Sequence, residues 1–190
     1  MLVFGKLAGI GAADYIKGVP QTNIDEAQAT AIIRRATAFL NREEGLNPFV
    51  VQEDLQKVMQ QLVGIMRLGT ELQKALSEIE RIKKDIEKVK AHASPQFNPG
   101  WNAANDLNNL IVTAEAVTMA ALAREESRGG HSRIDFQGER EEGLTYNNIL
   151  KKDPDGKMQL RREPRGVPPK ELSDIAYAKI EDLEVKTVYE

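Results

Sequence analysis

The segment AREESRGGHSRIDF, residues 123–136, holds the side chains of this sequence that could most readily do chemistry. His131, one of two histidines in 190 residues, lies between Arg128 and Arg133, and Asp135 follows closely. A histidine in such surroundings could act as a general acid or base, or could bind an anion. Alternatively, the segment is a loop that docks on another surface through ion pairs. The absence of a second catalytic group within sequence reach favours docking.

The end of a helix explains part of the same segment. Arg124 and Arg128 are predicted in its last turn, where positive charge suits the helix dipole. Gly129 or Gly130 would supply the left-handed residue that stops the helix. The residues expected to make docking contacts are Arg124, Ser127, Arg128, His131, Arg133 and Asp135.

Composition and motifs argue against chemistry elsewhere in the chain. Without cysteine, the chain cannot form a disulfide, a thiolate zinc site or its own iron–sulfur cluster. The sequence contains no Walker, G-x-S-x-G or H-E-x-x-H motif. A net charge of −3 does not suggest a nucleic-acid partner, and no apolar run is long enough for direct membrane insertion. We therefore predict no catalytic, cofactor-binding or metal-binding residue.

The elements that must position the segment are predicted to be helices. Hydrophobic residues make up 41% of the chain but aromatic residues only 5%, which favours helices packed through aliphatic side chains. A first helix is expected over 2–17, and it begins without a capping residue, as if cut. The second covers 23–42, with Asn23 as its N-cap. The third begins at Asn47, with Pro48 in its first turn.

Two longer helices complete the predicted bundle. Thr70 should cap the fourth, and the fifth should run over 101–127 before the docking segment. Apolar stripes mark the buried faces of the last three helices. Their predicted members are Val51, Leu55, Val58, Leu62 and Met66; Leu72, Leu76, Ile79, Ile82, Ile86 and Val89; and Ala104, Leu107, Ile111, Ala114, Thr118 and Ala121.

The pattern changes after the docking segment. Two short strands are expected around the turn at 153–156, Asp-Pro-Asp-Gly. An extended linker at 167–169 should lead to a short helical or irregular stretch at 173–182, and LEVKTVYE to a last strand. The predicted fold is mainly α: a bundle of three or more antiparallel helices, spectrin-repeat-like, followed by a β-hairpin and an extended tail.

Three strings together resemble the C-terminal part of the succinate dehydrogenase/fumarate reductase flavoprotein subunit. They are LVFGKLAG at 2–9, NPFVVQEDLQKVMQQLVGIMR at 47–67, and NPGWNAANDLNNLIVTAEAVTMAALAREESRGGHSRIDF at 98–136. Their order and separations also match. The resemblance implies three regions: 1–17 as the last helix of a truncated flavin-binding domain, 18–136 as the helical bundle, and 137–190 as the hairpin and tail.

The resemblance also implies a role within a larger enzyme. In the complete subunit, FAD oxidises succinate to fumarate and passes electrons to an iron–sulfur subunit, a step of the tricarboxylic acid cycle and of electron transport. The flavin-binding and catalytic motifs of the family precede LVFGKLAG, so this chain alone is expected to be inactive and to hold no cofactor. Its expected partners are the missing flavin-binding domain and the iron–sulfur subunit. The expected location is cytoplasmic, peripheral to the inner membrane in the full complex.

Two alternatives remain open from the sequence. L-aspartate oxidase belongs to the same superfamily and has a similar loop, so the chain could be a fragment of that flavoenzyme. It could also be a free-standing helical module that binds a protein partner. Self-association through an exposed apolar helix at 2–16 would separate a severed region from such a module, which should have a fully polar exterior.

Overall fold

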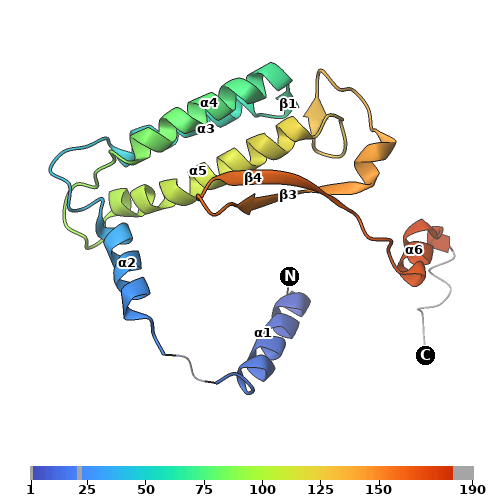
Figure 1. Ribbon diagram of the computed structural model, residues 1–190, viewed down its shortest axis with the longest axis horizontal. Helices are drawn as coiled ribbons and strands as arrows, with labels where there is room; N and C mark the ends of the chain where they lie inside the picture. Colours follow the sequence, from blue (N-terminus) through green and yellow to red (C-terminus); the bar gives the residue numbers. More distant parts are fainter. Residues whose placement is uncertain (1, 21–22, 182–190) are drawn as a thin grey trace.

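A three-helix bundle forms the centre of the computed structural model, which describes residues 2–20 and 23–181 (Figure 1). In the bundle, α3 (Pro48–Leu62), α4 (Gly69–Ile86) and α5 (Pro99–Ala123) each contact the other two, and consecutive helices run antiparallel. The other elements are α1 (Leu2–Ile16), α2 (Glu26–Thr37), β1 (Met66–Arg67), β2 (Ser132–Arg133), the 3-10 helix η1 (Glu141–Leu144), β3 (Tyr146–Lys152), β4 (Met158–Pro164) and α6 (Lys170–Tyr177).

The bundle core is almost entirely aliphatic, and the predicted stripes largely supply it. The six predicted positions of α5 are all buried, and Leu72, Ile79 and Ile82 of α4 are completely inaccessible. Met66 is an exception, because α3 ends at Leu62 and Met66 is 60% exposed in β1. At Gly64 a side chain would collide with the carbonyl of Gln60, which marks where the chain turns sharply out of the helix.

One of the three predicted helix caps is confirmed. The Asn47 side chain accepts a hydrogen bond from the Phe49 amide at 2.9 Å, and Pro48 occupies the first position of α3. The predicted cap at Asn23 is wrong: α2 begins three residues later, and Asp25 accepts from the Gln28 amide at 3.0 Å. Thr70 is also wrong as a cap, since α4 already begins at Gly69.

The hairpin is confirmed where the turn residues predict it. β3 and β4 are antiparallel, with Lys152 opposite Met158, and Gly156 adopts φ +83° in the turn between them. Both strands contact α5, so the hairpin lies along the bundle (Figure 1). The predicted helical stretch exists as α6, although it begins at Lys170. The predicted strand LEVKTVYE lies outside the described residues.

Three of the helices in the described part of the chain contribute nothing to the buried core. α1, α2 and α6 contain no buried residue, and α1 and α6 stand apart from the bundle in Figure 1. α1 is mostly apolar, yet Leu2 is 93% exposed and Phe4 78% exposed. Among the helices of the described residues, we find none that is both long and apolar enough to cross a membrane.

Candidate functional site

The docking segment begins earlier than predicted, because α5 ends at Ala123. Arg124 has extended backbone angles (φ −93°, ψ 97°), so it follows the helix and does not belong to its last turn. Gly129, with φ +58°, does not end the helix either. It forms a tight turn in which Arg128 and His131 exchange two backbone hydrogen bonds of 2.8 and 3.0 Å. The two glycines therefore shape a small hairpin after the helix.

Arg133 performs the C-terminal capping that the glycines were predicted to perform. Its side chain is 2% exposed, and its Nη1 donates to the carbonyls of Ala121, Leu122 and Arg124 at 2.9, 3.1 and 3.3 Å. These carbonyls lie at the negative end of α5, where a cation is favourable. Arg133 thus brings a positive charge to this helix end from ten residues further along the chain.

Asp135 joins this helix end to the start of another helix. Its carboxylate accepts from Arg133 Nε and Nη2, both at 2.8 Å, and from the backbone amide of Gly69 at 3.0 Å. Gly69 is the first residue of α4, so Asp135 takes the capping role predicted for Thr70. The hydrogen bonds from Arg133, followed by that from Gly69, hold the pKa of Asp135 far below its ordinary value. One ion pair therefore bridges the end of α5 and the beginning of α4.

Ser127 fixes the backbone of the loop around this ion pair. Its hydroxyl accepts from the Arg133 amide at 2.9 Å and lies 2.9 Å from the carbonyl of Phe136, to which it donates. The neighbouring β2 pairs in parallel with β1, so that Arg67 lies opposite Arg133. The loop is therefore attached to the connection between α3 and α4 as well as to α5.

His131 is held in its neutral form. Nδ1 lies 2.8 Å from Arg67 Nη1 and Nε2 lies 3.0 Å from the carbonyl of Arg124. A guanidinium can only donate and a carbonyl can only accept, so Nδ1 accepts and Nε2 carries the proton. Burial is the main cause that lowers the pKa of His131, and the charge of Arg67 adds to it. Among the described residues, the ring makes no hydrogen bond or ion pair with a carboxylate or a nucleophile, which leaves the acid–base interpretation without a second group.

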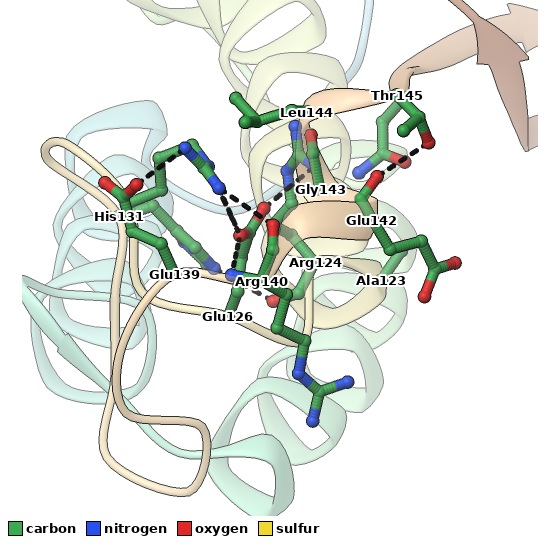
Figure 2. A network of polar contacts seen from close by, with 12 residues as sticks. Ala123, Arg124, Glu126, His131, Glu139, Arg140, Glu142, Gly143, Leu144 and Thr145 are labelled. Carbon is green, nitrogen blue, oxygen red and sulfur yellow. Dashed lines mark hydrogen bonds and ion pairs between the residues drawn. The ribbon is translucent and has the colours of Figure 1, made fainter.

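A buried carboxylate that the sequence did not reveal lies next to these residues (Figure 2). Glu126 is 2% exposed. It accepts from Arg128 Nη2 at 3.0 Å and from the Arg140 amide at 2.8 Å, while Arg124 Nη1 lies 3.0 Å from its other oxygen. These contacts, led by the hydrogen bond from Arg128, lower the pKa of Glu126. A side chain at position 143 would collide with this carboxylate, so Gly143 lets η1 pack against it.

The structure brings the six predicted docking residues into one polar region, together with Arg67 and Glu126. Most of their hydrogen bonds lie within the loop itself, and those to Gly69 of α4 and to Ala121 and Leu122 of α5 attach it to the bundle. Within the described residues we find no group of three His, Asp or Glu side chains that could hold a metal ion. Arg67 could not be predicted from the motif, because it lies 64 residues from His131. Glu126 lies within the segment 123–136, but the sequence could not distinguish it from Glu125, because the two differ in their burial.

Comparison with known proteins identifies the family. Residues 52–183 match the family described as fumarate reductase flavoprotein C-term. This chain belongs to that family. The matched region contains the bundle from residue 52 of α3 onward, the docking segment and the hairpin, and the resemblance inferred from the three strings is therefore confirmed.

Individual relatives agree with this assignment. The fumarate reductase flavoprotein subunit of Mycobacterium tuberculosis is 30% identical over 169 residues, which cover 84% of this chain and 29% of the relative. A Methanocaldococcus jannaschii protein named as an FAD-dependent oxidoreductase is 36% identical over 140 residues, covering 74% of this chain and 25% of the relative. Members of the flavoprotein family thus include FAD-dependent oxidoreductases, and the chain spans about a quarter to a third of their length.

A solved structure shows the same fold within a larger assembly. A chain of the Mycobacterium smegmatis Sdh1 complex in the apo form superimposes with a TM-score of 0.79 at 34% identity, over 96% of this chain and 33% of the other. The arrangement of bundle, loop and hairpin is therefore that of a family whose members are parts of succinate dehydrogenase and fumarate reductase complexes.

Proposed function

We propose that this chain is the C-terminal helical part of a succinate dehydrogenase or fumarate reductase flavoprotein, with a structural and docking role. In the assembled subunit, FAD would take a hydride equivalent from succinate, form fumarate, and pass electrons to an iron–sulfur subunit. The family match over 52–183 and the relatives named as fumarate reductase flavoprotein subunits support this assignment. The chain by itself is proposed to be inactive and to hold no FAD.

The observation that carries the docking role is the exposed apolar surface of α1. Leu2, Phe4 and Tyr15 are 93%, 78% and 73% exposed, on a helix with no buried residue. Apolar surfaces of this kind normally mark contacts with other protein. We propose that residues 1–17 act as the last helix of the flavin-binding domain and that this domain covers α1.

The docking segment is the proposed seam between the bundle (18–136) and the flavin-binding domain. Arg128 and His131 line an open pocket at the surface, while Arg133 and Asp135 hold the loop from behind. We propose the tail (137–190) as the part that lies near the iron–sulfur subunit, in a complex peripheral to the inner membrane.

The first test is the visible absorption spectrum of the purified chain after incubation with excess FAD and desalting. The proposal expects no retained flavin and no succinate-dependent dye reduction. Retained flavin would mean that the chain holds FAD without a flavin-binding domain and would contradict the assignment.

A second experiment tests the docking segment in a complete flavoprotein subunit that contains it. Arg128→Ala removes the contacts with Glu126 and Glu139, and is expected to lower stability or flavin retention before it lowers turnover. Lys84→Ala, an exposed change on α4, serves as the control. Normal flavin content with lost turnover would contradict docking and would favour a catalytic role.

A further inference from the structure

A pocket of about 420 Å³ opens at the surface where the docking segment meets α5 and β3. Its polar wall carries three arginines, and its other wall is built from small apolar residues of α5. The lining residues are Arg67, Arg124, Arg128, His131 and Asn148, with Val117, Ala120 and Ala121.

The positive charges of two of these arginines are already balanced. Arg124 and Arg128 both lie 3.0 Å from oxygens of the buried Glu126, and Arg128 also lies 2.8 Å from Glu139. Neither residue therefore requires a further anion, although both still contribute positive potential to the pocket.

Arg67 differs from both, because no carboxylate of the described residues balances its charge. In the part of the chain that the structure describes, no carboxylate oxygen lies within 4.0 Å of its guanidinium. Its Nε donates to the carbonyls of Val63 and Gly64 at 3.0 and 3.1 Å, and its Nη1 contacts His131 at 2.8 Å. Among the described residues, the Nη2 of Arg67 has no hydrogen-bond acceptor. The N–H groups on that edge of the fixed guanidinium are therefore still able to donate.

His131 orients Arg67 and adds no charge of its own. Its Nδ1 can accept from Arg67 only while the ring is neutral. The contacts with Val63, Gly64 and His131 together fix the guanidinium at the pocket, so little conformational freedom is lost when a ligand binds. The pocket is thus a preorganised cationic site with an apolar wall.

From these contacts we infer that the pocket binds a small organic carboxylate, anchored by Arg67. A guanidinium matches the geometry of a carboxylate through paired N–H donors. The apolar wall of Val117, Ala120 and Ala121 suits the carbon body of such a ligand better than it suits an inorganic anion. This inference goes beyond the proposed docking role and does not depend on it.

The two histidines offer a direct test by NMR. The purified chain is titrated with butyrate, inorganic phosphate and chloride at matched ionic strength, and the imidazole signals are followed. Butyrate is expected to move the His131 signals in a saturable way, while the exposed His92 stays unchanged. Phosphate is expected to bind at least fivefold more weakly, and chloride to have no saturable effect. Equal shifts of both histidines, no saturable shift, or tighter binding of phosphate would overturn the assignment.

Substitutions identify the anchor. Arg67→Gln should weaken butyrate binding at least tenfold, whereas Arg161→Gln, which removes an exposed guanidinium on β4, should leave it unchanged. Circular dichroism reports whether each variant is folded. If Arg67→Gln does not fold, Arg67→Lys keeps the charge and loses the paired donors, and binding several-fold weaker than the original is expected. Undiminished binding in a folded Arg67 variant would overturn the inference.

Discussion

Arg133 connects two helix ends through a single side chain. It donates to carbonyls at the end of α5 and forms an ion pair with Asp135, which in turn accepts from the first amide of α4. A buried guanidinium is expensive to desolvate, and it is stable here because five hydrogen bonds to backbone and carboxylate oxygens compensate it. The docking segment therefore stabilises the bundle by joining the end of α5 to the start of α4, in addition to forming a surface loop.

Removing this guanidinium should destabilise the bundle strongly. In Arg133→Ala the carboxylate of Asp135 loses its partner and the carbonyls of α5 lose their donor. Breaking such a pair from one side typically costs about 3 kcal/mol or more of unfolding free energy. Chemical denaturation measures the loss. Arg161→Ala, whose side chain is 65% exposed, should lose less than about 1 kcal/mol. Equal losses of unfolding free energy in the two variants would contradict the stabilising role of Arg133.

The lowered pKa of His131 makes the stability of the fold depend on pH. Its pKa in the folded protein lies below the ordinary value of 6.5, because burial and the neighbouring arginines disfavour the charged ring. The unfolded chain therefore binds a proton more readily as the pH falls below about 6.5. The stabilisation from neutral His131 is complete above that pH and is lost as the pH falls through the folded-state pKa.

A matched pair of variants isolates this contribution. His131→Gln removes the titrating ring and should flatten the fall in unfolding free energy between pH 7 and 5, although its stability at pH 7 is lower. His92→Gln should retain the original slope, because His92 is exposed and the proton-dependent contact with Arg67 belongs to His131. An unchanged slope in His131→Gln would show that other groups dominate this pH range.

At the scale of elements, local determinants could be read from the sequence and distant ones could not. Asn47 with Pro48 determines the start of α3, and the Asp153–Gly156 turn determines the hairpin. Both could be predicted because helix capping and turn formation depend on residues within four positions of one another. The end of α5 was missed because its cap comes from Arg133. The N-cap of α4 was missed because Asp135 lies 66 residues from Gly69. Hydrophobic periodicity identified the buried faces but not where each helix stops.

The revised start of α2 can be tested with two neighbouring residues. Asp25→Ala should remove the hydrogen bond to the Gln28 amide and destabilise α2 by about 1 kcal/mol. Because α2 has no buried residue, the change should appear as several-fold faster amide exchange confined to this helix. Asn23→Ala, at the cap expected from the sequence, should leave exchange unchanged. The reverse result would restore Asn23 as the cap.

At the scale of the whole molecule, stability and exposure are distributed unevenly. The aliphatic core lies in α3, α4 and α5, whereas the apolar residues of α1 are exposed to water. This contrast separates two of the hypotheses drawn from the sequence. A free-standing module should have a polar exterior and stay monomeric, whereas a part of a larger flavoprotein should carry a surface that associates when its natural cover is missing.

Self-association through α1 is therefore the expected behaviour of the isolated chain. Phe4→Glu places a charge on its apolar surface, where Phe4 is 78% exposed in the single chain. Burial of a phenylalanine contributes about 1.5–3 kcal/mol, so the variant should associate at least about tenfold more weakly. Sedimentation equilibrium measures this change. Gln73→Glu adds the same charge to the exposed face of α4 and should not alter association. A monomeric wild-type chain at high concentration, or equal effects of both variants, would favour the free-standing module.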